Sequence, residues 1–339
     1  MVKAAVIGLG KMGISHFAIV NPHPDVELVG VCDVSSFVLA GLRKYARTPC
    51  FDDYRKMIDQ TRPDCVVVAT PTASHAEILR FAMERGIHVF MEKPFCLGLE
   101  DGREMVKMAA ERGLVNQVGY HLRFVAAFNE AKRLLDAGAI GDVYHFTAET
   151  YGPVVLRPKG STWRTKKSEG GGCLYDYASH AINLVNYLVG MPQKVGGTVL
   201  KQVFSAGVED AVYASMWFAG GRTGQLSVNW SDETYRKMTN QMTIMGTAGK
   251  IVVDRQECRV FLRNKDGFED LTEGWNIKYT TDLTRPVWFY LRGEEYSAQI
   301  DYFIDHVKRR ATDNINSFAS ALETDTVIDL LRKDADALN

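Results

Sequence analysis

The sequence predicts an α/β protein of two domains: a doubly wound domain over residues 1–121, then an α/β domain over residues 122–339 with a large, mostly antiparallel, open sheet and C-terminal helices that can pack back on the first domain. Three observations lead to this prediction. Apolar strand patterns alternate with helical patterns through the first domain. A glycine-rich turn joins the first strand to the first helix. After Gly141, strand patterns follow one another with mostly short gaps.

Length and charge exclude several classes of protein. With 339 residues the chain is long enough for two domains with sizeable cores. Lys and Arg number 40 and Asp and Glu 41, so the net charge of -1 gives no general attraction to nucleic acid or to an anionic membrane. No apolar run reaches transmembrane length, and a strand pattern begins at Val2, leaving no room for a signal peptide. We therefore expect a cytoplasmic protein that recognises small molecules.

The cysteines give no sign of a metal site or a disulfide framework. They form no Cys-x-x-Cys pair and have no nearby histidine at ligand spacing. The six are scattered along the chain: Cys32, Cys50, Cys65, Cys96, Cys173 and Cys258. Several lie in apolar strand patterns, so we expect buried thiols, no metal and a reducing compartment.

The first motif is a glycine-rich turn between a strand and a helix. A strand pattern over residues 3–8 leads into Gly-Leu-Gly-Lys-Met-Gly, and a helical pattern follows to Val20. A second strand pattern over residues 27–32 ends at Asp33. A βαβ unit of about 30 residues, with an acidic residue about 20 positions beyond the last glycine, is typical of a dinucleotide-binding Rossmann domain.

Each glycine has an expected role in this interpretation. Gly8 permits the tight turn, Gly10 lets the backbone approach a pyrophosphate, and Gly13 lets helix and strand pack closely. The helix N-terminus, where Lys11 and Met12 lie, attracts the anion. These five positions are therefore expected to bind the cofactor.

Asp33 is expected to bind the ribose hydroxyls of the cofactor. Its carboxylate would repel a 2′-phosphate, and Val34-Ser35-Ser36 offers no immediate arginine to neutralise one. NAD is therefore the expected cofactor, with NADP the less favoured choice.

The motif Glu92-Lys93-Pro94 ends another buried strand pattern, residues 87–91. Open α/β sheets bind their ligands at the carboxyl ends of their strands, so we expect Glu92 and Lys93 to contact the cofactor. Pro94 removes a backbone donor and restricts Lys93 to extended or turn geometry, so the lysine is fixed in place. The other interpretation is an ordinary strand end with a solvated Glu-Lys pair.

A further strand pattern, residues 64–69, ends at Thr70 and Pro71, which we expect to line the cofactor. His75 follows them as a further candidate for cofactor contact, although an ordinary first-turn helix residue is the favoured interpretation. Ser74 and Glu77 have capping-box spacing, which predicts a helix over residues 74–85. The remaining elements expected in this six-stranded domain are helices over residues 36–45, 53–58 and 99–112 and a strand over residues 115–119.

The second domain is predicted to be rich in strands. In residues 225–230 apolar side chains take one face and polar side chains the other. We expect one face of the sheet to pack on a helix and the other, partly apolar, to be buried in a homodimer or homotetramer. The predicted strands are residues 143–151, 194–204, 211–218, 224–230, 242–245, 250–253 and 259–262.

A triple glycine, residues 170–172, precedes a helix with two different sides. At about 100° per residue, Asp176, His180, Asn183 and Tyr187 fall within roughly 60° of one another, opposite an apolar side. An Asp and a His at i and i+4 can hydrogen-bond, which would orient the imidazole. The alternative is a solvated polar face, but the triple glycine favours close approach of a ligand or another backbone.

Two further groups have two interpretations each. Tyr120, His121 and Arg123 follow a strand end, where they either contact substrate or support the next helix. A basic stretch approaches the triple glycine, either as a solvated loop or as a substrate site in which Arg164 and a lysine bind a phosphate or carboxylate, as in a nucleotide sugar or sugar acid. The residues named in this stretch are Arg157, Lys159, Trp163, Arg164, Lys166 and Lys167.

Taken in order, the glycine-rich turn, Ala69-Thr70-Pro71, Glu92-Lys93-Pro94 and residues 170–183 resemble the family of glucose-fructose oxidoreductase, inositol dehydrogenase and the rhizopine-catabolism oxidoreductases (Gfo/Idh/MocA). The resemblance implies a Rossmann domain followed by a domain with a large open sheet, and a nicotinamide facing the crevice between them. It also implies dimers or tetramers joined through the open sheet face.

By resemblance, Lys93 contacts the substrate, Asp176 orients it and His180 is the usual acid/base. Asn183 stands where many members have Asp. Oxidation of a secondary alcohol requires removal of the hydroxyl proton as hydride leaves carbon, for which a neutral imidazole is suited, and an ammonium can stabilise the developing alkoxide. We therefore expect His180 as base, Lys93 as electrostatic partner or proton relay, and Asp176 as orienting group.

The expected activity is that of an NAD(P)-dependent dehydrogenase acting on a sugar, cyclitol or sugar derivative. The alternatives are reduction of a keto-sugar, aldehyde or imine, a reaction that regenerates its cofactor internally, and a non-catalytic dinucleotide sensor. The joint presence of Lys93, Asp176 and His180 speaks against the sensor.

Overall fold

The computed structural model describes residues 1–154, 162–264 and 267–338. The chain divides into two compact units: Met1–His121 with Pro286–Leu322, and Leu122–Arg285 with Glu323–Asn339. Within the described ranges, no helix combines the length and the apolar character needed to cross a membrane.

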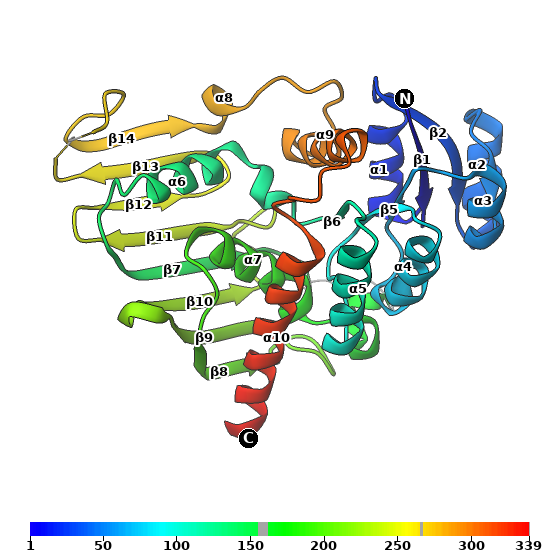
Figure 1. Cartoon of the computed structure of the whole chain (residues 1–339). Coiled ribbons are helices and arrows are strands. Elements are labelled where there is room, and N and C mark those ends of the chain that lie inside the picture. The colour runs from blue at the N-terminus through cyan, green and yellow to red at the C-terminus, as the bar shows by residue number, and fades with distance from the viewer. Residues whose placement is uncertain (155–161, 265–266, 339) are drawn as a thin grey trace. The chain divides into compact units, whose positions relative to one another are not determined.

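A six-stranded parallel sheet forms the centre of the first unit (Figure 1, blue to cyan). The strand order is β3-β2-β1-β4-β5-β6, the doubly wound arrangement that the sequence predicts. The shortest strand, β3, has two residues and no sequence pattern had indicated it. The bounds are β1 Val2–Ile7, β2 Val26–Cys32, β3 Cys50–Phe51, β4 Cys65–Val68, β5 His88–Met91 and β6 Asn116–Val118.

Helices cover both faces of this sheet. Along β1, Ala4 and Val6 point into one apolar cluster and Ala5 and Ile7 into another, because successive strand residues face opposite sides. The first cluster includes residues of α1, α2 and α9, and the second includes residues of α3, α4, α5 and the start of α10. The bounds are α1 Lys11–Val20, α2 Ser36–Tyr45, α3 Tyr54–Thr61, α4 His75–Glu84, α5 Leu99–Glu111, α9 Glu294–Arg309 and α10 Phe318–Leu338.

The capping box predicted at Ser74 is wrong. A 3₁₀ turn over Thr72–Ser74 leads into α4, so Ser74 has helical φ and ψ angles of -95° and -4° instead of the extended backbone of an N-cap. Its hydroxyl donates to the Pro71 carbonyl at 2.8 Å, while Glu77 accepts from Tyr54 at 3.0 Å. The serine therefore closes the turn after β4.

The second unit is built on an eight-stranded sheet with the order β14-β13-β12-β11-β7-β10-β9-β8 (Figure 1). Neighbouring strands are antiparallel except β7 and β10, which are parallel. Strand β14, at the edge, was not predicted. The bounds are β7 Val143–Tyr151, β8 Lys194–Lys201, β9 Ala211–Trp217, β10 Thr223–Asn229, β11 Gln241–Gly246, β12 Gly249–Val253, β13 Glu257–Leu262 and β14 Gly274–Tyr279.

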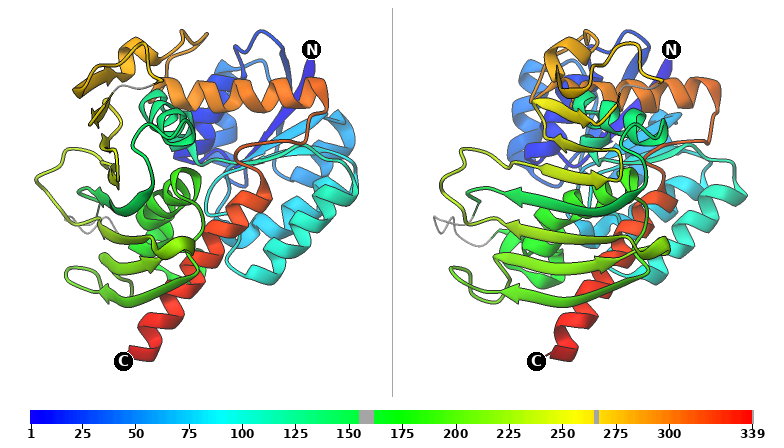
Figure 2. Two further views of the ribbon diagram at one scale, coloured as in Figure 1. Left: turned by 60° about the vertical axis from the view of Figure 1, so that its left-hand side comes forward. Right: turned by 90° about the vertical axis from the view of Figure 1, so that its left-hand side faces the viewer.

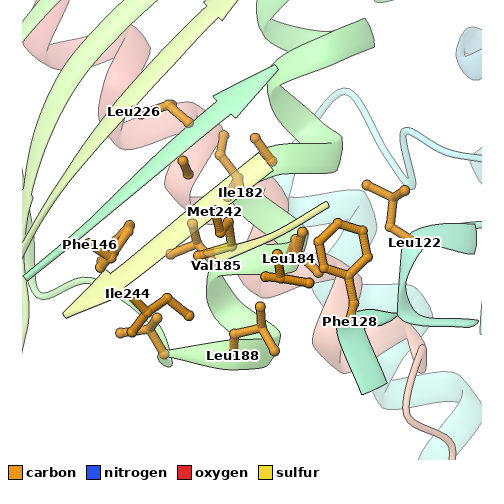
Figure 3. Close-up of a cluster of buried hydrophobic side chains, with 14 of the residues drawn as sticks. Leu122, Phe128, Phe146, Ile182, Leu184, Val185, Leu188, Leu226, Met242 and Ile244 are labelled. Carbon is orange, nitrogen blue, oxygen red and sulfur yellow. The ribbon is translucent and has the colours of Figure 1, made fainter. Parts of the chain in front are cut away.

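One face of this sheet carries the core of the second unit (Figure 3). Phe146, Met242 and Ile244 from the strands pack with residues of α6 (Ala126–Asp136) and α7 (Ser179–Leu188), among them Phe128 and Val185. The opposite face is turned to the viewer in the right-hand view of Figure 2, with α6 and α7 behind the strands. A short helix, α8 (Thr280–Leu283), follows β14.

Candidate active site

The glycine-rich turn after β1 has the backbone that a close approach to a dinucleotide requires. Gly8 has a φ of +87°, and a Cβ at Gly13 would lie 1.8 Å from the Gly8 carbonyl oxygen. A Cβ at Gly10 would meet nothing within 4 Å, so this side of the turn is open. Helix α1 begins at Lys11, immediately after the open glycine. The N-terminus of α1 is thus accessible to a phosphate group.

Asp33 lies against the same turn. One carboxylate oxygen accepts from Leu9 N at 2.5 Å and the other from Ser35 N at 2.7 Å, so the side chain joins the ends of β1 and β2. Thr70 lies on the other side, with its methyl group 2.9 Å from the position of a Cβ at Gly8. Turn, acid and helix terminus together fit NAD, with Gly8, Gly10, Gly13 and Asp33 as the residues that would hold it.

Two alanine substitutions separate the roles of Gly13 and Gly10. Gly13→Ala is expected to destabilise the protein by about 3 kcal/mol or more, because the new Cβ meets backbone that cannot move aside. Gly10→Ala is expected to change the free energy of unfolding by less than about 0.5 kcal/mol and to weaken NADH binding at least about tenfold. Thermal unfolding and NADH fluorescence titration measure the two effects. Unchanged NADH affinity in Gly10→Ala would contradict the assigned pyrophosphate position.

Glu92 is not a solvated strand end. The residue is 8% exposed, and its carboxylate lies 2.6 Å from His16 Nε2 and accepts from Lys93 N at 3.2 Å. A Cβ at Gly119 would come within 3.0 Å of the same carboxylate. Contact between Glu92 and the cofactor stays a prediction, whereas the observed contacts support a structural role: the side chain fixes the backbone of Lys93 to α1.

No sequence motif indicates His16. The histidine is fully buried on α1, where its ring packs edge-on against Phe90 with centroids 5.2 Å apart. The one available signal was a histidine on the buried side of an otherwise apolar helix three positions after Gly13. Its partner is 76 positions away, which no local pattern indicates.

His75 lies in the interior of the first unit. Its Nε2 is 3.0 Å from the Thr70 carbonyl oxygen and its Nδ1 is 3.2 Å from that of Phe95. Burial lowers the pKa of the ring, against the opposing effect of these two carbonyls. A neutral ring donates to only one of them. His75 is the first residue of α4, as the favoured interpretation expected, and its ring also joins the loops after β4 and β5, which the sequence had not indicated.

In the second unit, Asp176 and His180 lie on a helical segment that starts with a π-helical turn, Leu174–Ala178, before α7. The wider turn means that the spacing of 100° per residue does not hold at Asp176. Asp176, His180 and Asn183 are 4%, 5% and 1% exposed, so the alternative of a solvated polar face is wrong. A hydrogen bond between Asp176 and His180 stays a prediction.

Arg164 binds Asp176. Its Nε donates to the buried carboxylate at 2.8 Å, and its guanidinium stacks over Trp163 at 4.5 Å from the ring centroid. The backbone of these two residues approaches the triple glycine, since a Cβ at Gly171 would lie 2.5 Å from the Arg164 carbonyl oxygen. The expected close approach at the triple glycine is therefore made by another backbone. Arg157 and Lys159 lie outside the described residues.

Arg123 contacts α7, a later helix than the next one, α6, that the sequence offered as its second interpretation. The residue is 5% exposed, and its guanidinium donates to the Asn183 side-chain oxygen at 2.8 Å and to the Asn183 carbonyl at 3.2 Å. The Asn183 amide in turn donates to Thr324 Oγ1 at 3.0 Å. An amide both accepts and donates here, which a carboxylate does not do. Substrate contact by Arg123 stays a prediction without support from these contacts.

Tyr120 and His121 are anchored within the first unit. The Tyr120 carbonyl accepts from Asn316 at 2.8 Å, and the His121 ring stacks on Tyr296 with centroids 4.5 Å apart. Among the described residues, no group of three or more His, Cys, Asp or Glu side chains is arranged to hold a metal ion.

Two family profiles match the chain. Residues 2–120 match the oxidoreductase family with an NAD-binding Rossmann fold, and residues 128–252 match the GFO/IDH/MocA C-terminal domain. The chain belongs to the GFO/IDH/MocA family. It is an NAD-dependent oxidoreductase, and its N-terminal unit is the Rossmann domain that binds the cofactor.

Similar members of the GFO/IDH/MocA family differ in activity. D-glucoside 3-dehydrogenase of Escherichia coli K12 is 27% identical over 264 residues, which cover 73% of this chain and 74% of that protein. A 2,7-anhydro-N-acetylneuraminate hydratase of Mediterraneibacter gnavus is 29% identical over 273 residues, 78% of this chain and 70% of that protein. The structure of levoglucosan dehydrogenase with NADH and levoglucosan has the same fold, with a TM-score of 0.89 and 24% identity over 100% of this chain and 98% of that one.

Proposed function

We propose that this protein oxidises a secondary alcohol of a sugar, cyclitol or sugar derivative, with NAD as the hydride acceptor. The observation that carries the proposal concerns the helical segment that bears Asp176 and His180. Both side chains are buried, and Asp176 pairs with Arg164, which lies before the segment. A buried carboxylate and a buried imidazole are costly unless they act on a ligand or on a polar partner. The glucoside dehydrogenase among the relatives supports a sugar substrate.

In this proposal, NAD supplies the hydride acceptor when bound. His180 takes the hydroxyl proton as the C–H bond breaks and the C=O bond forms. The ammonium of Lys93, at the carboxyl end of β5, stabilises the negative charge that develops on the oxygen. Asp176 orients the substrate hydroxyl or His180. The same groups run the reverse reduction of a keto-sugar, so direction depends on substrate supply.

The contacts of Arg164 favour an uncharged substrate over a phosphorylated one. Its charge is already matched by the buried Asp176 carboxylate at 2.8 Å, which lowers its attraction for a second anion. Trp163 is partly exposed beside it and offers an aromatic face to the apolar C–H face of a sugar ring. We therefore propose that Trp163 and Arg164 contact a neutral polyol.

We also propose a homodimer or homotetramer joined through the outer face of the eight-stranded sheet. On β14, Trp275, Ile277 and Tyr279 are 53%, 49% and 49% exposed, and these alternate residues share one face. Exposed apolar patches of this kind favour association. A reducing, cytoplasmic setting is proposed from the scattered cysteines.

The test is NADH formation at 340 nm with purified protein against free polyols, sugars, sugar phosphates and nucleotide sugars. We expect turnover on free sugars or cyclitols, with the phosphate of the same sugar a poorer substrate. Equal or higher catalytic efficiency on the phosphate would contradict the neutral-substrate proposal. NAD binding without reaction in either direction would contradict the dehydrogenase and favour the dinucleotide sensor.

The relative named as a hydratase favours a second candidate, a reaction that regenerates its cofactor internally. Such an enzyme would convert substrate without net formation of NADH. Product analysis by mass spectrometry with a catalytic amount of NAD distinguishes the two: a dehydrogenase stops after one turnover per NAD, whereas a cofactor-regenerating enzyme continues.

A further inference from the structure

We propose that Glu209 is a positioning residue for the helical segment that carries Asp176 and His180. Glu209 belongs to the loop between β8 and β9 and touches neither of these two side chains in any contact described above. The inference rests on the catalytic roles proposed for Asp176 and His180, and it assigns to a distant loop the task of placing them.

Glu209 binds the first two amide groups of the segment. Its backbone carbonyl accepts from Cys173 N at 3.0 Å, and its carboxylate accepts from Leu174 N at 2.9 Å. The first N–H groups of a helical segment have no partner within it and must be satisfied from outside. A carboxylate in this position also interacts favourably with the helix dipole.

The space for this carboxylate exists because residue 172 is glycine. A Cβ at Gly172 would lie 2.2 Å from a carboxylate oxygen of Glu209, and the φ of +108° is itself suited only to glycine. The last glycine of the triple glycine therefore admits a buried acid. Glu209 is 7% exposed, and burial raises the pKa of its carboxyl, while the Leu174 amide and the charge of Lys167 oppose that shift.

The neighbouring Asp210 joins several parts of the loop by hydrogen bonds. One oxygen accepts from the backbone N–H groups of residues 203, 204 and 205, at 2.7, 2.7 and 3.0 Å, and the other accepts from Trp230 Nε1 at 2.9 Å. Burial alone would raise the pKa of Asp210, but hydrogen bonds from Ser205, Trp230 and Val203 lower it to about 2. Glu209 thus belongs to a loop that is held in place by the Asp210 carboxylate.

The two hydrogen bonds that Glu209 accepts lie close to Asp176 in the sequence. Asp176 lies two residues beyond Leu174, inside the π-helical turn, and its carboxylate meets Arg164 at 2.8 Å. A turn that is fixed at its first two amides holds Asp176 in register, and misplacement of a reacting group by about 1 Å can cost about 100-fold in rate. Glu209 therefore acts on turnover through the placement of Asp176 and His180.

The test compares three variants of the full chain. Glu209→Ala removes the carboxylate, Glu209→Asp keeps its charge but shortens its reach, and Glu209→Gln keeps an acceptor oxygen of nearly the same shape. Glu273→Ala, an exposed glutamate of the same unit, is the matched control. The readouts are kcat and KM for the sugar, NADH affinity, and amide hydrogen exchange of a peptide spanning residues 172–178.

We expect kcat to fall about 10- to 100-fold in Glu209→Ala and Glu209→Asp, with NADH affinity unchanged and faster exchange in the peptide. Glu209→Gln is expected to retain kcat within about threefold and to keep slow exchange, and Glu273→Ala to resemble the wild type. If Glu209→Ala does not fold, Glu209→Asp carries the comparison. Wild-type kcat and exchange in Glu209→Asp would overturn the inference, as would equal losses in Glu209→Gln and Glu209→Asp.

Failure of the proposed function is distinguishable from failure of this inference. Hydrogen exchange reports the placement of the segment without any turnover. Faster exchange in Glu209→Asp and normal exchange in Glu209→Gln would support the anchor even if the wild type acts on no sugar. Unchanged exchange in an active enzyme would overturn the anchor alone.

Discussion

His180→Asn is expected to lower kcat for alcohol oxidation by about 10²- to 10⁴-fold, the range typical for loss of a general base. Asparagine keeps a hydrogen-bonding side chain of similar size at this buried position but cannot take a proton near pH 7. NADH binding should be unchanged, because the predicted cofactor residues lie in the first unit. Steady-state kinetics and NADH fluorescence titration measure the two effects.

The matched control is His88→Asn, at the start of β5, where the ring accepts from Val115 N at 3.0 Å and takes no part in the proposed site. It should retain wild-type kcat. Should His180→Asn turn over as fast as the wild type, the imidazole is not the base, and Lys93 becomes the preferred candidate for that role.

Lys93→Ala is expected to lower kcat by about 10²- to 10³-fold, because the developing alkoxide loses its electrostatic partner. Lys107→Ala is the control, since its side chain is 75% exposed on α5 and pairs only loosely with Glu111 at 3.8 Å. Lys93→Arg separates charge from geometry: a partial recovery of kcat would indicate that positive charge is the main requirement. Loss of NADH affinity in Lys93→Ala, with kcat intact, would instead make the lysine a cofactor ligand.

The first unit was predicted well from sequence because its signals are local. A parallel strand that is buried on both faces appears in the sequence as a continuous apolar run. The spacing of Gly8, Gly10 and Gly13 is visible as well, because all three belong to one turn. Strand β3 was not predicted, because a strand of two residues is too short to show a periodic pattern. The prediction of a capping box at Ser74 was wrong because serine is favoured both in a 3₁₀ turn and at an N-cap.

The polar partners of the site were not predictable in the same way. Asp176, His180 and Lys93 were selected from motifs, but the contacts that fix them depend on packing between distant segments. Glu92 meets His16 across 76 positions and Leu174 meets Glu209 across 35. No helical wheel indicates the π-helical turn, because a wheel assumes the same rotation at every residue.

Helix α9 comes late in the chain but belongs to the first unit, which affects how that unit folds during translation. Helix α9 contributes Ile300, Phe303 and Ile304 to the apolar cluster that covers one face of the parallel sheet, next to Ile19 of α1. During translation that face is covered only by α1 and α2 until α9 has emerged, long after the last strand of its sheet. The cofactor domain is therefore completed late, and residues 1–121 cut out as a fragment would expose the apolar surface that α9 covers.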